Sequence, residues 1–289
     1  MTPELAIIIP HYNDPVRLER CLGALMAQDR AGVEVAVVDN ESPVDLSALQ
    51  ARFPEAAWIF EPIRGAAAAR NRGVAETRAP WIVFLDSDCV PEAGWLARAR
   101  QVAQGPQVIT GGEVTVFDES PPPRSGAEAF EATFAFQQAQ YIAEKGFSVT
   151  ANLITPRVIF DAVGPLIVGR SEDLDWCQRA RAAGYDLVYD PALVVAHPSR
   201  SDWAALARKW RRLTAEAYET RRANGGRAPG WVLRALAMVP SALFHGPRML
   251  RAPGLSTGDR LRGLGTLFRL RLARMIWMLR QALTGRAEV

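Results

Sequence analysis

The stretch WIVFLDSDC, residues 81–89, runs five apolar residues directly into two carboxylates, Asp86 and Asp88. Trp81 to Leu85 has the length and apolar character of a buried strand. Side chains two apart on an extended segment point the same way, so Asp86 and Asp88 face one crevice. The two carboxylates repel each other unless a cation lies between them, and hard divalent ions prefer oxygen ligands. The pair therefore indicates a Mg²⁺ or Mn²⁺ site, with a solvated acidic loop as the alternative.

Short apolar runs alternate with helix-like segments around this stretch. Strands are expected at 5–9, 33–38, 58–60, 81–85 and 107–117, and helices at 15–28, 66–77 and 92–103. This alternation predicts parallel pairing with right-handed crossovers. Ligands of such sheets bind beyond the carboxyl ends of the strands. Three of these runs end in polar segments, PHYND, DNES and DSDC. We therefore expect an α/β fold whose site is assembled from strand ends.

The pattern is less regular after the Pro-rich segment SPPPRSG at 120–126. Helices are expected at 127–143, from 156 and at 172–183, a strand near 147–151, and two short strands around a Pro turn within 185–197. We expect one domain over residues 1–202, with two halves at 1–117 and 118–202.

The C-terminal region differs from the rest of the chain in charge. Residues 201–289 hold 17 Lys and Arg against 5 Asp and Glu, whereas residues 1–200 hold 17 against 26. A basic helix is expected at 203–222, followed by the break NGGRAPG and by two apolar, arginine-rich segments at 231–250 and 260–283. We therefore expect 203–289 to form a helical, basic, amphipathic region that faces an anionic partner.

The segment 260–283 has one apolar stripe at helical spacing, flanked by Arg262, Arg269 and Arg280. Its members are Leu261, Leu264, Phe268, Leu272, Met275, Leu279 and Leu283. Charges and Pro240 interrupt both apolar segments, so a membrane-spanning helix is disfavoured. Two interpretations stay open: association of 203–283 with an anionic membrane face, or packing on the catalytic domain or a second subunit. No nucleic-acid motif is present, and the sequence does not indicate the oligomeric state.

The cysteines indicate a reducing environment. Cys21, Cys89 and Cys177 are widely spaced and form no CxxC pair, so neither a disulfide framework nor a zinc site is expected. The N-terminus has no basic segment followed by the apolar run of a secretory signal. These features predict a cytoplasmic protein, peripheral on the inner face of the cell membrane if the C-terminal region binds lipid.

Other residues could carry chemistry at the same strand ends. His197 closes the apolar run LVVA and could be a metal ligand, although a histidine there is commonly a packing residue. RGAAAARNRG at 64–73 reads as a glycine turn and a helix start, whose arginines suit phosphate or a base unless they are solvated. Glu172, Asp173 and Asp175 begin a helix, where acids are ordinary dipole partners. Such crowding can also raise the pKa of one carboxylate and make it a general base.

Taken in order, IIPHYND, VVDNES, RGAAAARNRG, FLDSD, SEDLDWCQR and a later histidine resemble the family 2 glycosyltransferases over about residues 5–200. The resemblance implies the GT-A fold, a Rossmann-like, mixed and mostly parallel sheet flanked by helices. It makes 1–202 the catalytic domain, with a nucleotide-binding half at 1–117 and an acceptor half at 118–202. It also implies an inverting enzyme that moves a sugar from a UDP- or dTDP-type nucleotide-sugar donor to the hydroxyl of a glycan or lipid-linked acceptor. Its expected cofactor is Mn²⁺ or Mg²⁺.

The resemblance assigns roles to individual residues. The residues that bind the nucleotide in the family correspond here to Pro10, His11, Tyr12, Asn13, Asp39, Arg70 and Asp86. Asp88 and His197 correspond to the metal ligands. Asp173 corresponds to the catalytic base, with Glu172 as the alternative at the same helix start. Asn40 departs from the family pattern, because many relatives have a second Asp there.

Two other functions use similar architecture. A sugar nucleotidyltransferase needs a Gly-rich, basic stretch after the first strand, which PHYNDP does not supply. A non-catalytic nucleotide- or glycan-binding protein is disfavoured by the acids at 86, 88 and 173. The absence of GxGxxG and GxxxxGK[ST] after the first strand argues against dehydrogenases and P-loop NTPases. The sugar, the acceptor and the linkage depend on loops near 118–170, which contain no motif that identifies them.

Overall fold

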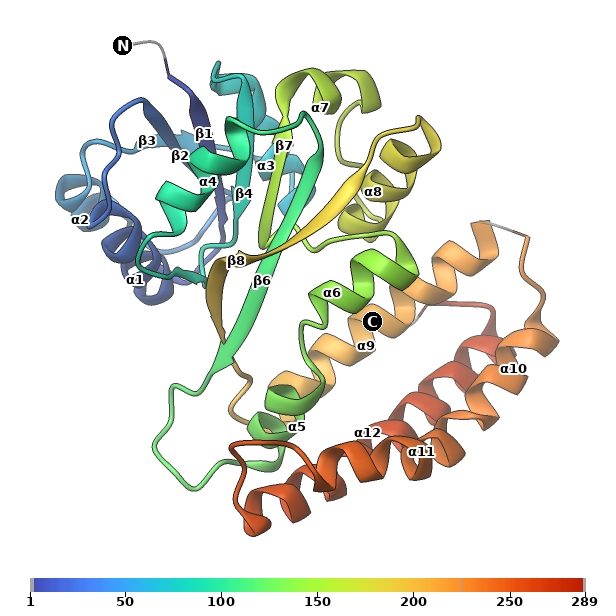
Figure 1. The fold of residues 1–289 in the computed structure, drawn as a ribbon. Coiled ribbons are helices and arrows are strands. Elements are labelled where there is room, and N and C mark those ends of the chain that lie inside the picture. The colour runs from blue at the N-terminus through green and yellow to red at the C-terminus, as the bar shows by residue number, and fades with distance from the viewer. Residues whose placement is uncertain (1–2, 224, 288–289) are drawn as a thin grey trace. The chain divides into compact units, whose positions relative to one another are not determined.

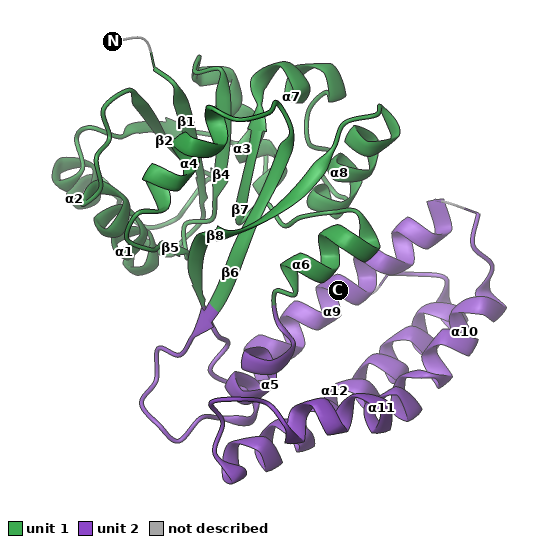
Figure 2. Ribbon diagram, viewed as in Figure 1, with its two compact units in different colours: residues 1–115, 136–197 green, residues 116–135, 198–289 purple. Residues whose placement is uncertain are grey.

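The structure is a computed structural model that describes residues 3–223 and 225–287. The chain forms two compact units (Figure 2): unit 1 comprises residues 1–115 and 136–197, and unit 2 comprises residues 116–135 and 198–289. The predicted domain boundary at residue 202 stays a prediction. Residues 116–135 pack with the C-terminal helices, which no local feature of the sequence indicated.

An eight-stranded mixed sheet with helices on both faces forms the framework of unit 1 (Figure 1). Its strands are β1 (Leu5–His11), β2 (Val33–Asp39), β3 (Ala57–Phe60), β4 (Trp81–Leu85), β5 (Val90–Pro91), β6 (Ile109–Phe117), β7 (Asn152–Pro156) and β8 (Leu187–Pro198). They follow the order β3-β2-β1-β4-β7-β6-β8-β5. The first four pair in parallel, and β7 lies antiparallel to both β4 and β6. The predicted α/β fold, with a mixed sheet flanked by helices, is confirmed.

The helices of unit 1 lie between these strands in the sequence. They are α1 (Pro15–Met26), α2 (Ser47–Arg52), α3 (Ala66–Glu76), α4 (Trp95–Ala103), α6 (Gln138–Gln140), the π-helix η1 (Tyr141–Lys145), α7 (Arg157–Val163) and α8 (Glu172–Ala182). Asp14 caps α1, because its carboxylate accepts from the Arg17 N–H and Pro15 lies at the first helical position. Gly73 lets α3 approach the sheet, since a Cβ there would lie 2.4 Å from Ile8 Cγ2.

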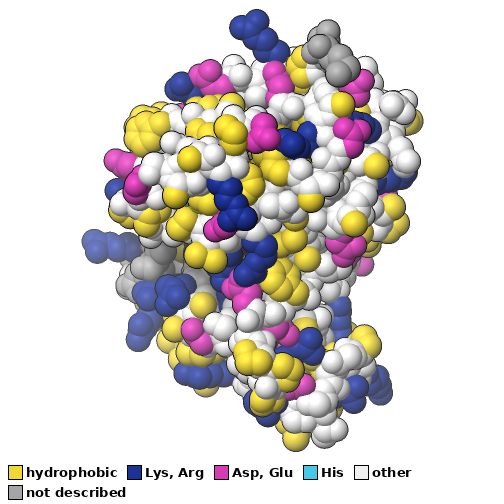
Figure 3. All heavy atoms as spheres, turned by 90° about the vertical axis from the view of Figure 1, so that its left-hand side faces the viewer, with side chains coloured by type: hydrophobic (Ala, Val, Ile, Leu, Met, Phe, Trp, Pro, Cys, Tyr) yellow, Lys and Arg dark blue, Asp and Glu magenta, His cyan; other side chains and the backbone are white. Residues whose placement is uncertain are grey.

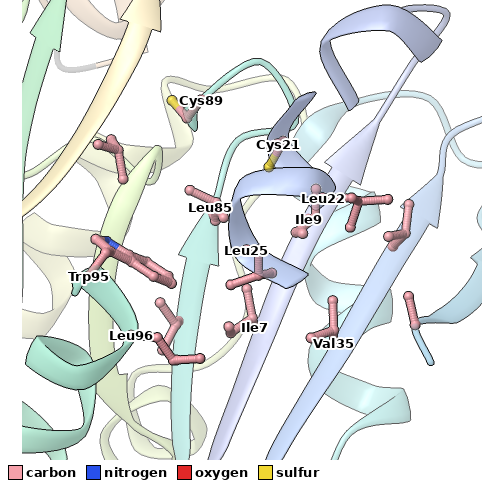
Figure 4. Close-up of a cluster of buried hydrophobic side chains, with 14 of the residues drawn as sticks. Ile7, Ile9, Cys21, Leu22, Leu25, Val35, Leu85, Cys89, Trp95 and Leu96 are labelled. Carbon is pink, nitrogen blue, oxygen red and sulfur yellow. The ribbon is translucent and has the colours of Figure 1, made fainter. Parts of the chain in front are cut away.

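Alternation along β1 builds two cores from one strand. Leu5, Ile7 and Ile9 belong to a cluster with α1 and α4 on one face, whereas Ala6 and Ile8 belong to a cluster with α3, α7 and α8 on the other. Figure 4 shows Ile7, Ile9, Leu22, Leu25 and Trp95 within the first cluster. Both faces are covered, so β1 is buried over its whole length and its carboxyl end is held rigidly.

Three predictions of secondary structure were wrong in detail. The strand expected at 147–151 is β7 at Asn152–Pro156, because pairing with β4 sets its position: Leu85 lies opposite Asn152 and Trp81 opposite Pro156. The two strands expected within 185–197 are one strand, β8. Pro191 lies within it, and the carboxylate of the preceding Asp190 accepts from the Ala192 N–H at 2.9 Å. The helix expected at 127–143 is broken after α5 (Gly126–Phe134).

Unit 2 is helical, as expected for the C-terminal region. It contains α5, α9 (Trp203–Ala223), α10 (Ala228–Leu236), α11 (Met238–Leu250) and α12 (Thr257–Thr284). Capping boxes begin two of them, Ser125 with Glu128 at α5 and Ser256 with Asp259 at α12. Within residues 3–223 and 225–287, no helix combines the length and the apolar character needed to cross a lipid bilayer.

The apolar stripe of 260–283 is mainly an internal surface of unit 2. α12 packs against α5, α9, α10 and α11. Leu264, Phe268, Met275 and Leu279 contact hydrophobic clusters of this unit. Leu261, Leu272 and Leu283 are exposed. The predicted stripe is therefore used chiefly for packing, because a long central helix supplies the core of a helical bundle.

Candidate active site

The carboxyl ends of β1, β2 and β4 meet at a pocket of about 260 Å³. It is lined by Pro10, His11, Tyr12, Asp14, Asn40, Ala66, Ala69, Arg70, Asp86, Ser87 and Asp88. Parallel pairing explains this meeting, because the register places His11 beside Asp39 and Ile8 beside Phe84. Six of the predicted site residues line the pocket: Pro10, His11, Tyr12, Arg70, Asp86 and Asp88. Every predicted site residue belongs to unit 1.

His11 and Asp39 form a buried hydrogen-bond network at one side of the pocket. His11 Nδ1 lies 3.0 Å from Asp39 Oδ1, and His11 Nε2 accepts from the Asp14 N–H at 3.1 Å. Nε2 as acceptor requires the tautomer in which Nδ1 donates its proton to Asp39. Ser42 donates to the same Asp39 oxygen at 2.5 Å. The network fixes the orientation of Asp39 while its carboxylate also lines a second hollow of about 230 Å³ beside Trp58 and Phe60.

Asn40 holds the loop that leads to α3. Its Nδ2 donates to the carbonyl oxygens of Glu61 at 2.9 Å and Ile63 at 2.7 Å, and its Oδ1 accepts from the Gly65 N–H at 2.8 Å. An aspartate could not donate either of the first two bonds. The asparagine that departs from the family pattern is thus matched to three backbone groups of this loop.

Arg70 connects the two acidic segments of the site. Arg70 is 3% exposed, its Nη2 donates to Asp86 Oδ1 at 2.5 Å and its Nη1 donates to Glu172 Oε1 at 3.0 Å. Burial acts to lower the pKa of Arg70, but Asp86, Glu172 and Asp173 together raise it above its ordinary value. Arg70 therefore stays charged and holds the segment that follows β4 and the first turn of α8 in one site.

Asp173 is the titratable carboxylate of this site. Burial, followed by the charge of Glu172, raises the pKa of Asp173 to about 7, although Arg70 opposes the change. The Thr150 N–H is 3.4 Å from Asp173 Oδ2. Glu172 is engaged by Arg70, whereas Asp173 has the pKa of a group that can take a proton near neutral pH. Of the two acids that the sequence left as alternatives, Glu172 is therefore the one that Arg70 holds.

Asp88 and His197 lie side by side although they are far apart in the sequence. Asp88 Oδ2 is 3.1 Å from His197 Nε2. His197 is buried, and the ring of Phe136 packs 4.7 Å from its ring between centroids. A carboxylate suits Mn²⁺ or Mg²⁺, and an imidazole is a common ligand of transition metals. Within the described ranges no group of three or more His, Cys, Asp or Glu could hold a metal ion by itself. Asp88 and His197 would hold a cation only together with further oxygen ligands.

Two arginines of the segment 64–73, and also Asn13, lie outside the pocket. Arg64 pairs with Glu41, and Arg72 pairs with Glu76 one turn along α3. Asn13, at a positive φ of 52°, does not line the pocket, and its N–H donates to Ser42 at 2.7 Å.

The sequence did not predict three contacts of the site: Ser42 with Asp39, Thr150 with Asp173 and Phe136 with His197. The S of VVDNES was a visible signal for Ser42, because a serine three residues after an aspartate can bond back to it. Nothing in the sequence marks Phe136, which takes a left-handed backbone with φ of 47°.

Comparison with known proteins gives the family of this chain. The profile described as Glycosyl transferase family 2 matches residues 6–175. The glycosyltransferase AglE of Haloferax volcanii is 31% identical over 223 residues, which is 72% of this chain and 71% of AglE. A pre-mycofactocin glycosyltransferase of Mycobacterium tuberculosis is 27% identical over 219 residues, or 70% of this chain and 45% of that protein.

Two solved structures have the same fold at low sequence identity. The mannosyltransferase PcManGT from Pyrobaculum calidifontis, in complex with GDP-Man and Mn²⁺, superposes with a TM-score of 0.60 at 18% identity over 99% of this chain and 88% of its own. S. aureus TarS 1-349 in complex with UDP gives 0.54 at 14% identity over 91% and 70%. The fold is therefore GT-A, and this chain is a glycosyltransferase that belongs to glycosyl transferase family 2.

Proposed function

We propose that this enzyme transfers a sugar, with inversion, from a UDP- or dTDP-sugar to the hydroxyl of a glycan or lipid-linked acceptor, using Mn²⁺ or Mg²⁺. The observation that carries the proposal is the double contact of Arg70 with Asp86 and Glu172. These contacts join Asp86, which is expected to bind the donor, to helix α8, which bears the expected base Asp173. A single displacement needs both groups in one site.

The donor side of the proposal rests on two adjoining hollows. Asp39 lines the hollow of about 230 Å³. Its Oδ1 accepts from His11 and from the Ser42 hydroxyl, and its Oδ2 accepts from the Ser42 N–H at 3.2 Å. One lone pair of Oδ2 is left to accept from the N–H of a uracil- or thymine-type base. Asp86 lines the pocket of about 260 Å³, where it would accept from the ribose hydroxyls. Pro10 and Tyr12 line the same pocket, and His11 holds Asp39 in place.

The chemical step is assigned to Asp173 acting on the acceptor. Asp173 takes the proton of the acceptor hydroxyl, the acceptor oxygen bonds to the anomeric carbon, and the bond from that carbon to the diphosphate oxygen breaks. Attack opposite the departing diphosphate inverts the anomeric centre. A divalent cation bound at Asp88 and His197 would neutralise charge on the diphosphate. Arg70 donates to Glu172, so that Asp173 is left to accept the proton.

A donor panel tests this proposal. UDP-glucose, UDP-N-acetylglucosamine, dTDP-rhamnose and GDP-mannose are each incubated with the purified chain in Mn²⁺, in Mg²⁺ or in a chelator, and the released nucleotide is measured. We expect release from a UDP- or dTDP-sugar only with a divalent cation. Asp88→Asn should reduce turnover at least about a hundredfold, because the diphosphate loses its cation. The configuration of the product at the anomeric carbon, from NMR coupling constants, tests inversion.

Controls separate the parts of the proposal. Binding of Mn²⁺ followed by electron paramagnetic resonance should weaken in Asp88→Asn and stay unchanged in Asp161→Asn, an acid of α7 outside the site. Turnover of GDP-mannose alone would overturn the donor assignment. Nucleotide binding by calorimetry without turnover of any donor would favour the non-catalytic alternative.

The proposed location is cytoplasmic and peripheral on an anionic membrane face. Its support is the basic composition of residues 201–289, with 17 Lys and Arg against 5 Asp and Glu. The three cysteines, Cys21, Cys89 and Cys177, are buried and form no disulfide, which agrees with a reducing compartment.

A further inference from the structure

Helices α10 and α11 expose an apolar face. This face is separate from the apolar stripe that the sequence predicts on 260–283. Leu233, Leu236, Leu243 and Phe244 are 69%, 52%, 70% and 83% exposed. Ala237 between the helices is in the right-handed helical region, with φ of −72° and ψ of −12°. Positions 233, 236, 240, 243, 244 and 247 therefore recur at intervals of three or four along a nearly continuous helix. We call these residues the outer face.

The side of α10 and α11 opposite the outer face is buried. Trp231, Ala235, Ala242, Gly246 and Met249 are buried in unit 2. Trp231 also donates through Nε1 to Gln281 of α12 at 3.2 Å. The helix pair is thus apolar on two sides, and a helix of this kind is normally covered on both.

The charge around the outer face restricts what can cover it. Residues 220–258 contain six arginines and no acidic residue. Three of these arginines are exposed beside the outer face. Arg234 follows Leu233 directly, Arg248 lies one helical turn after Phe244, and Arg251 lies two turns after Phe244. By contrast, hydrophobic, basic and acidic side chains are mixed on the face of the molecule that Figure 3 shows.

A second copy of the chain is a poor partner for such a surface. A two-fold interface places the same patch against itself, so the arginines of one copy would face those of the other without acidic partners. An anionic bilayer offers the complementary pair of properties, since phosphates meet the arginines while acyl chains receive the leucines and Phe244.

We infer that the outer face of α10 and α11 lies in the headgroup layer of an anionic membrane, with Leu233, Leu236, Leu243 and Phe244 inserted toward the acyl chains. This inference rests on the proposed peripheral location and names the surface responsible for it. It assigns α12 to the interior of the helical unit, so that α10 and α11 make the contact.

Vesicle sedimentation of the full chain tests the inference. Vesicles of phosphatidylcholine alone are compared with vesicles that also contain phosphatidylglycerol. The double variant Leu243→Gln/Phe244→Gln should bind the anionic vesicles about tenfold or more weakly than the parent, because two side chains lose acyl contacts. Arg251→Gln should weaken binding about fivefold, and only to the anionic vesicles. The matched control Val158→Gln/Val188→Gln removes two exposed aliphatic side chains from unit 1 and should bind like the parent.

The possible outcomes are distinct. A parent that binds no vesicle would refute both the peripheral location and this inference. A parent that binds anionic vesicles, with a double variant that binds equally well, would refute the outer face alone. A double variant that loses self-association on gel filtration instead of lipid binding would assign the face to a second copy. Unchanged circular dichroism and unchanged nucleotide release in the variants separate loss of binding from loss of folding or of the glycosyltransferase site.

Discussion

Each unit holds a carboxylate whose pKa is shifted, and the two carboxylates differ in their charge balance. In unit 2, Glu131 is 2% exposed and accepts from Lys209 Nζ at 2.7 Å and from the Arg200 N–H at 2.8 Å. Burial alone would raise the pKa of Glu131, but Lys209 and Arg200 outweigh it and lower that pKa. In unit 1, Asp173 lies beside Glu172, and their common cation Arg70 is shared with Asp86.

The comparison shows how charge balance can distinguish a structural acid from a reactive one. Glu131 has two cations for one negative charge, so it stays ionised and ties α5 to α9. The site of unit 1 has at least three acids around one buried arginine, so one of them, Asp173, binds a proton near neutral pH. The excess of acid opposes folding and gives Asp173 the pKa that the proposed base requires.

The largest expected effect is on activity, from Asp173→Asn. The amide cannot accept the acceptor's proton, so kcat should fall by about 10²–10⁴-fold. Asp175→Asn is the matched control, because Asp175 is in the same helix turn but pairs with Arg170 and Arg179 at 2.8 Å. Steady-state kinetics on both variants checks this. Comparable losses in the two variants would mean that the helix start, rather than Asp173, supports turnover.

A comparable loss of stability is expected from Glu131→Gln. Arg200 and Lys209 would then face a neutral amide in a buried place, which should cost about 3–5 kcal/mol of unfolding free energy. Urea unfolding measures this cost. Glu216→Gln removes one i,i+4 pair with Arg212 on α9 and should cost less than about 0.5 kcal/mol. If Glu131→Gln lowers the unfolding free energy no more than this control, burial of Arg200 and Lys209 does not require the Glu131 carboxylate.

The two acids should respond oppositely to pH. The pKa of Asp173 is raised from 3.8 to about 7, so its favourable contribution to stability is complete at low pH and is lost as the pH rises through about 7. The pKa of Glu131 is lowered, so its contribution is present above the ordinary glutamate pKa and is lost on acidification. Relative to the parent in chelator, Asp173→Asn should therefore gain stability between about pH 4 and about pH 7 and level off above it. Thermal unfolding across this range tests the slope, and a gain that appears only on acidification would contradict it.

The sequence predicted the elements whose signals are local, and it did not predict the contacts that depend on the assembled fold. The strand runs ending at His11, Asp39 and Leu85 were visible as apolar segments, and parallel pairing then brings their ends together. Asp88 and His197 were paired by the family resemblance. The position of β7 depends on pairing with β4, which no local pattern specifies. The contact of Arg70 with Glu172 spans 102 residues and was likewise not predicted.

The smallest effect is expected from Asn40→Asp, which adds an acid at the edge of the same pocket. The carboxylate cannot donate to the Glu61 and Ile63 carbonyl oxygens, and leaving such acceptors unpaired costs about 1–3 kcal/mol. The variant should also raise the donor KM, because a further negative charge stands beside the diphosphate, while kcat changes less. Asn71→Asp is the control: it disrupts a similar amide contact with Leu166, which should lower stability without changing the donor KM. If the donor KM of Asn40→Asp is unchanged, an added acid at this edge of the pocket does not affect donor binding, and the effect of excess acid is limited to the surroundings of Asp173. If the unfolding free energy is unchanged, the loop does not need the amide.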